Sequence, residues 1–209
     1  MTDLFAGRVL FHCHTSHTDG RPTVDDYVCY AAEHGIERVV FLEHIRRVPS
    51  YDVPAFADEV RASGERHGVP TNVGFEAKVL PGGELDIADE HLALADVTGI
   101  AEHGFPDDAA LWEASLRQAF ETYGGDAARP AVWVHPGLWL RKTRRLDALR
   151  GTYEALLGAA QDAGVFVEQN ARYGLLTDDD RALVRPASLV RGADAHRLAD
   201  VAAFFDATG

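Results

Sequence analysis

Histidine and acidic side chains follow a short apolar segment near the start of this sequence. The segment Val9–Phe11 is typical of a β-strand and runs directly into His12 and His14, with Asp19 a few residues later. In an extended chain, residues two apart project to the same face, so His12 and His14 are expected to point together while Cys13 points away. Two imidazoles beside a carboxylate are ligands that zinc and similar divalent cations accept. The stretch therefore indicates a metal site, against the alternative of two unrelated surface histidines.

The same combination of an apolar segment and a side chain that can bind metal recurs along the chain. The seven side chains are His14, His44, Glu76, His103, His135, Glu168 and Asp194. Subtraction of their residue numbers gives separations of 30, 32, 27, 32, 33 and 26 residues, about the length of one strand–helix–strand unit. We therefore expect seven strands that each deliver a polar side chain at the carboxyl end. Histidines with purely structural roles would not be expected to keep this spacing.

Helical segments separate most of the expected strands. Thr23 is expected to cap the first helix together with Asp26, in an Asp variant of the capping box, and Gly35 to end it. The other expected helices span 54–67, 87–94, 107–123 and 146–163, and the other expected strands 39–42, 72–75, 97–101, 131–134, 165–167 and 189–190. Alternating strands and helices predict a parallel sheet, and this many units favours a barrel. The carboxyl ends of barrel strands open onto one face, so the seven side chains would share one pocket.

The bulk composition restricts the possible function classes. The 209 residues, 46% of them hydrophobic, fit a single domain spanning 1–209. A formal net charge of −13 disfavours binding to nucleic acid, unless bound metals reverse the local sign. No apolar window approaches the ~20 residues of a membrane span, and no secretory signal is visible. Two cysteines form no disulfide framework, so a cytoplasmic location is expected, whereas the sequence carries no signal for oligomeric state.

Taken in order, these motifs resemble those of the PHP (polymerase and histidinol phosphatase) superfamily across essentially the whole chain. The matching motifs are His12-x-His14 with Thr18-Asp19-Gly20, Glu43-His44, Gly74-Phe75-Glu76, His103, His135-Pro136-Gly137, Glu168-x-Asn170 and Gly192-Ala193-Asp194-Ala195-His196. Each motif is weak alone, but their shared order and spacing is specific. The resemblance implies a distorted (β/α)7, TIM-like barrel that holds two or three divalent metal ions and hydrolyses phosphate esters. The ligand mixture suits Zn, Mn or Fe.

The resemblance also implies a ligand set for each metal. The sets are His12, His14, Glu76 and Asp194 for one metal, Glu76, His103 and His135 for a second, and Asp19, His44 and His196 for a third. Two positions depart from the family pattern. Glu43 stands where many members have Asp, which is expected to matter little because it only precedes the ligand His44. Asp19 stands where some members have histidine, which gives the third metal a mixed ligand set.

Such a ligand set has a chemical use of its own. Three carboxylates and six neutral imidazoles carry a charge of −3, against +6 for three divalent ions, so the pocket would attract a phosphate dianion. A water bridging two ions would lose a proton near neutral pH and attack phosphorus in line, with no covalent enzyme intermediate. Glu76, Asp194 and His196 are the catalytic candidates among the ligands.

Four further side chains are candidates for substrate binding: Arg46, Asn170, Arg172 and Arg197. Arg172 and Arg197 follow strand-end motifs and could bind phosphate oxygens with a bidentate guanidinium, so both are also catalytic candidates. The alternative for each arginine is a solvated surface charge. Glu168 and Asn170 are expected to orient a ligand or bind substrate, while His17 is expected to be a plain loop residue.

The leading expectation is a metal-dependent phosphoesterase that acts on a small-molecule phosphate monoester, of histidinol-phosphatase type or directed at a nucleotide or other metabolite. One alternative is C–N or lactone hydrolysis, because related metal barrels direct the same hydroxide at a carbonyl carbon. Arg172 and Arg197 favour phosphate instead. A second alternative is a non-catalytic metal-binding module, which the retention of every implied ligand disfavours. A polymerase-linked exonuclease is disfavoured because the chain is one acidic domain.

Overall fold

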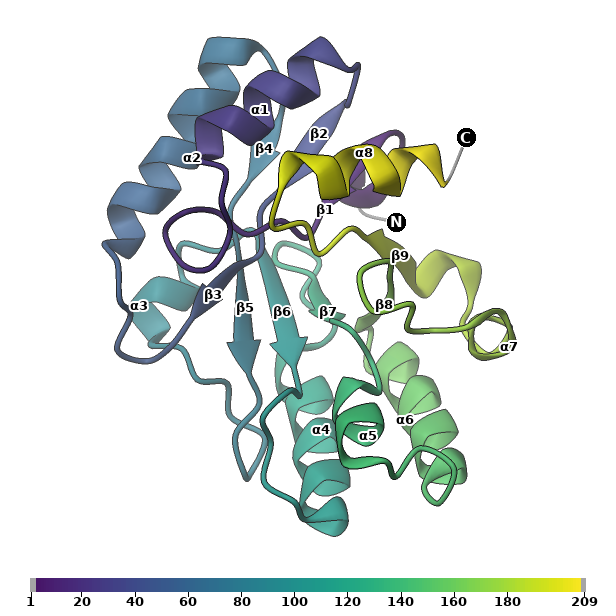
Figure 1. Ribbon diagram of the computed structural model, residues 1–209. Helices are drawn as coiled ribbons and strands as arrows, with labels where there is room; N and C mark the ends of the chain where they lie inside the picture. Colours follow the sequence, from purple (N-terminus) through teal and green to yellow (C-terminus); the bar gives the residue numbers. More distant parts are fainter. Residues whose placement is uncertain (1–2, 208–209) are drawn as a thin grey trace.

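A computed structural model of the protein describes residues 3–207, in which parallel strands lie inside a layer of helices (Figure 1). The strands are β1 (Val9–Phe11), β2 (Arg38–Val40), β3 (Glu43–Ile45), β4 (Thr71–Asn72), β5 (Gly74–Lys78), β6 (Val97–Ala101), β7 (Ala131–Trp133), β8 (Phe166–Asn170) and β9 (Leu189–Gly192). The α-helices are α1 (Val24–Glu33), α2 (Val53–His67), α3 (Asp89–Leu92), α4 (Ala109–Tyr123), α5 (Leu138–Thr143), α6 (Arg150–Asp162), α7 (Asp178–Arg181) and α8 (Leu198–Asp206). Two 3₁₀ turns, η1 (Asp3–Phe5) and η2 (Pro186–Ser188), complete the secondary structure of this part of the chain.

The strands pair into two parallel sheets, whereas the sequence predicts one closed barrel of seven strands. One sheet has the order β1-β2-β4 and the other the order β3-β5-β6-β7-β8-β9. Two of the expected strands are split, into β2 and β3 and into β4 and β5, because the backbone changes partners between the halves. The Phe41 amide donates to the Asn72 carbonyl, but the next amide, that of Leu42, donates to the Cys13 carbonyl. The expected parallel α/β architecture is thus confirmed. The strands do not form one continuous, closed sheet of hydrogen bonds as the predicted barrel requires.

Backbone hydrogen bonds also join the first strand to the segment after the last. The Ala193 amide donates to the Phe11 carbonyl at 2.9 Å, and the Ala195 amide donates to the His12 carbonyl at 3.0 Å. In return, the His14 amide donates to the Ala195 carbonyl at 2.9 Å. The N-terminal and C-terminal motifs therefore lie side by side, although more than 180 residues separate them in the sequence.

The strands are apolar on both faces, as expected for a buried parallel sheet. Leu10 packs in a large cluster that extends to the helices, whereas its neighbour Phe11 packs in a second cluster with Val40, Val132 and Val190. The alternation along β1 places successive side chains on opposite faces. The second cluster fills the space between strands, so the polar side chains at the strand ends rest on an apolar base.

Local sequence signals explain where the main helices begin and end. Thr23 caps α1 in the expected capping box, in which the Asp26 amide donates to its hydroxyl and the Asp26 carboxylate accepts from the Thr23 amide. Helix α2 ends at Gly68, which has a left-handed φ of 69°. Helices α1 and α2 lie together beside β2 and β4 (Figure 1). Helix α6 begins at Arg150, four residues later than the sequence predicts, and α5, α7 and α8 were not predicted.

Several expected ligands lie inside strands and not after them. Glu76 is the third residue of β5, and His44 is the middle residue of β3. Parallel pairing sets His44 directly beside Glu76 in the register between these two strands. The strands extend further than the apolar runs because the partner strand continues to supply hydrogen bonds at these polar positions. Among residues 3–207, no helix combines the length and apolar character needed to cross a membrane.

Candidate metal centre

The Glu76 carboxylate is the centre of the polar cluster. Its Oε2 atom lies 3.0 Å from His12 Nε2 and 3.4 Å from His14 Nε2. Its Oε1 atom lies near three more imidazole nitrogens, at 3.2 Å from His135, 3.3 Å from His103 and 3.6 Å from His44. Burial alone would raise the pKa of Glu76, but these histidines hold it well below its usual range. The side chain is therefore an ionised, buried carboxylate that bridges the ligand histidines.

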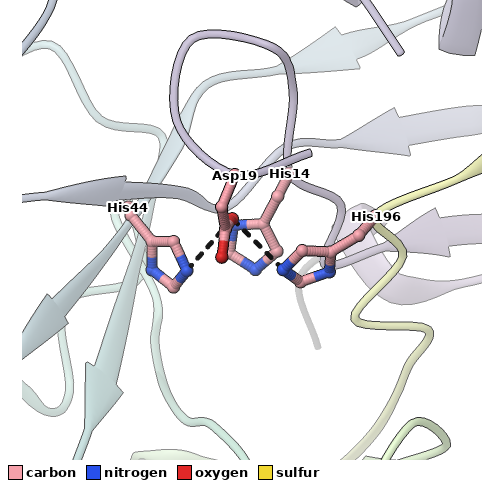
Figure 2. A group of neighbouring side chains, drawn as sticks. All are labelled: His14, Asp19, His44 and His196. Atoms are coloured by element: carbon pink, nitrogen blue, oxygen red, sulfur yellow. Dashed lines mark ion pairs between the residues drawn. The ribbon is translucent and has the colours of Figure 1, made fainter. Parts of the chain in front are cut away.

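A second group of side chains gathers around Asp19 (Figure 2). Asp19 Oδ1 lies 3.5 Å from His44 Nε2 and 3.2 Å from His196 Nε2. The His14 and His44 rings stack at a centroid distance of 4.2 Å. Asp194 connects this group to the first, because its Oδ1 lies 3.6 Å from His14 Nε2 and 3.5 Å from His196 Nδ1. All nine side chains that the family resemblance implies as ligands are thus brought into one cluster.

The donor atoms form four overlapping groups, each with its atoms within 4.8 Å of one another. The groups are His12, His14 and Glu76; His14, Asp19, His44 and His196; His44, Glu76 and His103; and His12, His135 and Asp194. Two groupings differ from the implied ligand sets. His135 groups with His12 and Asp194, and His44 groups with Glu76 and His103 as well as with Asp19. The grouping of these donor atoms therefore depends on geometry that the motifs do not encode.

The chemistry of this donor set fits divalent cations. His12 Nε2 and His14 Nε2 face each other at 3.1 Å, an arrangement that a shared cation stabilises. Burial alone would lower the pKa of His12, but Glu168 and Asp194 raise it to about 10. In the same cluster, burial lowers the pKa of His103 to about 3, which keeps that imidazole neutral. The buried carboxylates thus require positive charge, and imidazole and carboxylate donors suit Zn, Mn or Fe.

Three of the ligand residues have an unusual backbone conformation. The φ angles of His12, His135 and Asp194 are 67°, 35° and 50°, in the left-handed region that residues with a Cβ rarely adopt. These three residues form one of the four donor groups. Strained backbone of this kind persists where the surrounding structure enforces it, and it concentrates at functional sites. The conformation turns all three side chains out of the strand pattern and toward the cluster.

Glu168 supports two of the ligand residues from behind. Its Oε1 accepts a hydrogen bond from His12 Nδ1 at 2.6 Å, which leaves His12 Nε2 directed at the cluster. Its Oε2 accepts from the His135 amide at 2.6 Å and from Asn170 Nδ2 at 3.0 Å. Asn170 Nδ2 also donates to Asp194 Oδ2 at 3.2 Å, and its Oδ1 accepts from the Tyr173 amide at 2.9 Å. Glu168 and Asn170 are both buried, and their polar atoms are directed at the protein.

Glu43 has a structural role that the sequence analysis missed. This fully buried carboxylate accepts from the Thr15 amide at 2.7 Å and from the Thr15 and Thr18 hydroxyl groups. It also lies 3.8 Å from His14 Nδ1. Glu43 therefore holds the loop that carries Asp19. The sequence signal for this role is an acidic residue that directly follows the apolar run 39–42. Glu102, in the equivalent position after β6, accepts from the Trp139 amide and from Trp112 Nε1.

Three cavities adjoin the ligand cluster. The innermost, of about 210 Å³, is lined by ligands together with Leu138, Lys142, Arg172 and Tyr173. A larger cavity of about 780 Å³ shares Asp19, Arg172, Asp194 and His196 with it. A third, of about 290 Å³, includes His44, Glu76 and His103 in its wall. Lys142 and Tyr173 were not predicted, and their only sequence signal is their place on the segments that follow two strand-end motifs.

The substrate-binding candidates occupy different positions around these cavities. Arg172 Nη1 lies 2.8 Å from His196 Nδ1 and 3.3 Å from the Asp194 carbonyl, beside the ligands. Arg197 lines the larger cavity only. Arg46 lines the third cavity, is 62% exposed and lies 3.5 Å from the Asp86 carboxylate. His17, expected to be a loop residue, is held by Glu59 at 2.9 Å.

Comparison with known proteins supports the fold. No protein-family model matches the sequence, and no curated protein matches it. Among solved structures, the chain is similar to a two-domain protein from Bacteroides vulgatus that contains a predicted PHP-like metal-dependent phosphoesterase. The TM-score is 0.51 at 16% sequence identity, over 92% of this chain and 53% of that chain. This chain therefore spans about half the length of that protein.

Two further likenesses are weaker. A candidate metal-dependent phosphoesterase from Bifidobacterium adolescentis gives a TM-score of 0.36 at 16% identity, over 91% of this chain and 88% of that chain. An amidohydrolase II gives a TM-score of 0.48 at 14% identity, over 90% of this chain and 87% of that chain. Likenesses at such low identity concern the fold alone. The fold of this chain is therefore supported by its likeness to the Bacteroides vulgatus protein, and that likeness is one of fold.

Proposed function

We propose that this protein is a metal-dependent phosphoesterase that hydrolyses a small-molecule phosphate monoester. The observation that carries the proposal is a cluster of nine candidate metal ligands, seven of which line a cavity that Lys142 and Arg172 also line. Buried imidazoles and carboxylates provide the metal ligands, while the two cations provide a place for an anionic substrate. The acidic chain as a whole would repel a phosphate, so positive charge in this cavity is needed for binding.

Two or three divalent ions of the Zn, Mn or Fe kind would be held by His12, His14, Asp19, His44, Glu76, His103, His135, Asp194 and His196. When bound in such a cluster, divalent ions activate water and withdraw charge from phosphate oxygens. Glu76 contributes an ionised carboxylate to two donor groups, so we assign it the bridging position. Glu168 and Asn170 act as positioning residues, because their hydrogen bonds orient His12 and Asp194.

Arg172 and Lys142 are placed to bind the substrate phosphate. The guanidinium of Arg172 reaches His196 and lines the innermost cavity, so it can donate to phosphate oxygens beside the ligands. Lys142 lines the same cavity and offers a second positive charge. Leu138 and Tyr173 complete the lining of this cavity. Attack on phosphorus in line with the leaving oxygen needs no protein nucleophile, so we expect no covalent intermediate.

We also propose that the two sheets are parts of one distorted (β/α)7 barrel. Taking β2 with β3 and β4 with β5 leaves seven strand positions, in agreement with the seven-fold spacing of the ligands. The hydrogen bonds between β1 and the segment after β9 support a return to the starting strand. A histidinol-phosphatase-like activity is one member of the proposed class.

The proposal is tested by reconstitution of metal-stripped protein separately with Mn, Zn and Fe, followed by assays on a panel of phosphate monoesters. At least one monoester is expected to be hydrolysed only after metal is restored. The panel includes amides and lactones, because turnover of these without any phosphate monoester would contradict the proposal. Elemental analysis below one metal per chain after reconstitution would also contradict it.

Arg172 provides a sharper test of phosphate recognition. Arg172→Ala should leave metal content intact and lower kcat/KM for a phosphate monoester by about 1.5–3 kcal/mol, the scale of a hydrogen bond to a charged group. Arg172→Lys should restore only part of the loss, because an ammonium cannot donate as a bidentate fork. Arg181→Ala is the matched control, since Arg181 on α7 pairs with Asp178 away from the cavities. Wild-type turnover by Arg172→Ala would contradict this role.

A further inference from the structure

The largest cavity beside the metal ligands has a wall rich in arginine. Besides Arg172, which it shares with the innermost cavity, it is lined by Arg21, Arg191 and Arg197. These three arginines do not line the innermost cavity, although the larger cavity shares Asp19, Asp194 and His196 with it. Small residues such as Ala171, Ala193 and Ala203 make up much of the remaining wall.

The arginines of this wall differ from most others in the chain in lacking a carboxylate partner. Ten arginines form an ion pair with Asp or Glu within the described part of the chain. For Arg21, Arg191 and Arg197, no such pair is present in residues 3–207. In a protein with 33 acidic residues, three arginines that line one cavity without forming an ion pair indicate a site for an external anion.

The backbone holds this wall against the ligand cluster. The Arg21 amide donates to the His196 carbonyl at 2.9 Å, and Arg197 is the residue that follows His196. The guanidinium of Arg191 packs over the ring of Phe204 on α8 at 5.4 Å. Asp200 is the one acid of this lining that is not a proposed ligand, and its carboxylate accepts from the His196 amide at 2.9 Å. Arg21 and Arg197 are therefore held beside His196 by the backbone. The Asp200 carboxylate already accepts a hydrogen bond from the His196 amide.

We propose that the cavity lined by Arg21, Arg191 and Arg197 binds a second anionic group of the substrate. The preferred substrate is then a phosphate monoester that carries a second phosphate or a carboxylate at the end opposite to the reacting group. Arg172, which lines both cavities, would lie between the two anions. This inference rests on the proposed phosphoesterase function and deepens it by naming the substrate class.

The inference is tested first by binding, without turnover. Alkane-1,n-bisphosphonates with three to six carbons, ω-carboxyalkyl phosphonates of the same lengths and the corresponding alkyl monophosphonates are titrated into metal-reconstituted protein by calorimetry. At least one dianionic-ended ligand should bind about tenfold or more tightly than its monophosphonate, the effect of a charged hydrogen bond. The bisphosphonate and carboxylate series distinguish which second anion is favoured. Equal affinity for the one-ended and two-ended ligands at every length would overturn the inference.

Variants assign the effect to the proposed wall. Arg21→Ala and Arg191→Ala should each reduce the preference for the two-ended ligand about tenfold, whereas Arg185→Ala, which removes an arginine paired with Asp162, should retain it. A preference that survives in the Arg21→Ala, Arg191→Ala double variant would overturn the assignment. The kcat/KM ratio of an alkanediol bisphosphate to its monophosphate should follow the same pattern. Absence of turnover for every phosphate ester would contradict the proposed function. The phosphonate affinities would still show whether the arginine-lined cavity binds a second anion.

Discussion

At the scale of single residues, the candidate site depends on the Glu76 carboxylate and on the backbone turns that bring histidines to it. His12 is held through both ring nitrogens, because it touches Glu76 and His14 through Nε2 and Glu168 through Nδ1. Its left-handed φ of 67° directs the ring into the cluster. A residue in this position would contribute to the proposed metal site through its own donor atom and through the partners that it holds.

His12→Ala is expected to remove at least one metal ion per chain and to abolish hydrolysis, because it deletes a donor shared by two of the four groups. Elemental analysis of the purified and reconstituted variant measures the loss. His34→Ala is the control, since the His34 ring lies on the surface, where it contacts Tyr30. Equal damage from both substitutions would contradict the assignment of the cluster.

Glu168→Gln is expected to weaken metal binding about 10–100-fold, the usual effect of removing a carboxylate that supports a ligand histidine. The amide keeps the size of the side chain but cannot supply the charge that faces His12 Nδ1. Competition with a chelator measures the affinity, and Glu113→Gln on α4, where Glu113 pairs with Arg117, is the control. An unchanged affinity in Glu168→Gln would show that Glu168 does not act through His12.

At the scale of secondary-structure elements, close approach of strands positions the supporting residues. Strands β8 and β9 pair so that Asn170 lies beside Gly192, and Glu168 passes directly over the Cα atom of that glycine. A Cβ atom at position 192 would overlap with Glu168 Oε1. Packing against Glu168 therefore requires a glycine at position 192. The requirement does not come from a direct contact with the candidate ligand Asp194.

Gly192→Ala is expected to displace Glu168 and so to lower both metal affinity and thermal stability. Gly158→Ala on α6 is the matched substitution, because a Cβ there meets nothing within 4 Å. That variant should gain about 0.5–1 kcal/mol in the free energy of unfolding, since alanine favours the helix over glycine. Chemical denaturation and chelator competition on both variants measure the two effects. A Gly192→Ala protein with wild-type metal affinity would contradict the proposed packing constraint.

At the scale of the whole molecule, strands from both ends of the chain supply one buried cluster of like-charged carboxylates. The side chains of Glu76, Asp194 and Glu168 are all buried. Within residues 3–207, the ion pairs of these three carboxylates are with histidines. Without metal, protonated histidines must balance this charge, as the raised pKa of His12 indicates. Bound metal would therefore stabilise the fold by holding the N-terminal and C-terminal motifs together.

Removal of metal is expected to lower Tm, and Mn, Zn or Fe should each restore it, with a shift that grows with the logarithm of the affinity at a fixed free metal concentration. At a free metal concentration 100 times Kd, one site contributes about 2.7 kcal/mol. For a domain of this length, that corresponds to a rise in Tm of about 5–10 °C. Differential scanning calorimetry of stripped and reconstituted protein measures the shift, and His12→Ala should show a smaller one. Identical Tm values with and without metal would contradict a resident metal site.

The sequence by itself determined the residue types, their spacing and the alternating parallel architecture. The capping box at Thr23 and the end of α2 at Gly68 were predictable because they depend on side chains a few residues apart. The convergence of the polar strand ends was predictable for a related reason, since parallel strands of equal repeat length present their carboxyl ends on one side.

Only the tertiary structure decided how the ligands are shared and what supports them. The split of two strands, the grouping of His135 with His12 and Asp194, and the inward orientation of Asn170 depend on pairing between distant segments. The left-handed φ of His12 and Asp194 leaves no local signal, because neither residue is a glycine. Distances of 3 to 4 Å between donor atoms are set by register, backbone strain and packing across the whole chain, none of which a local motif contains.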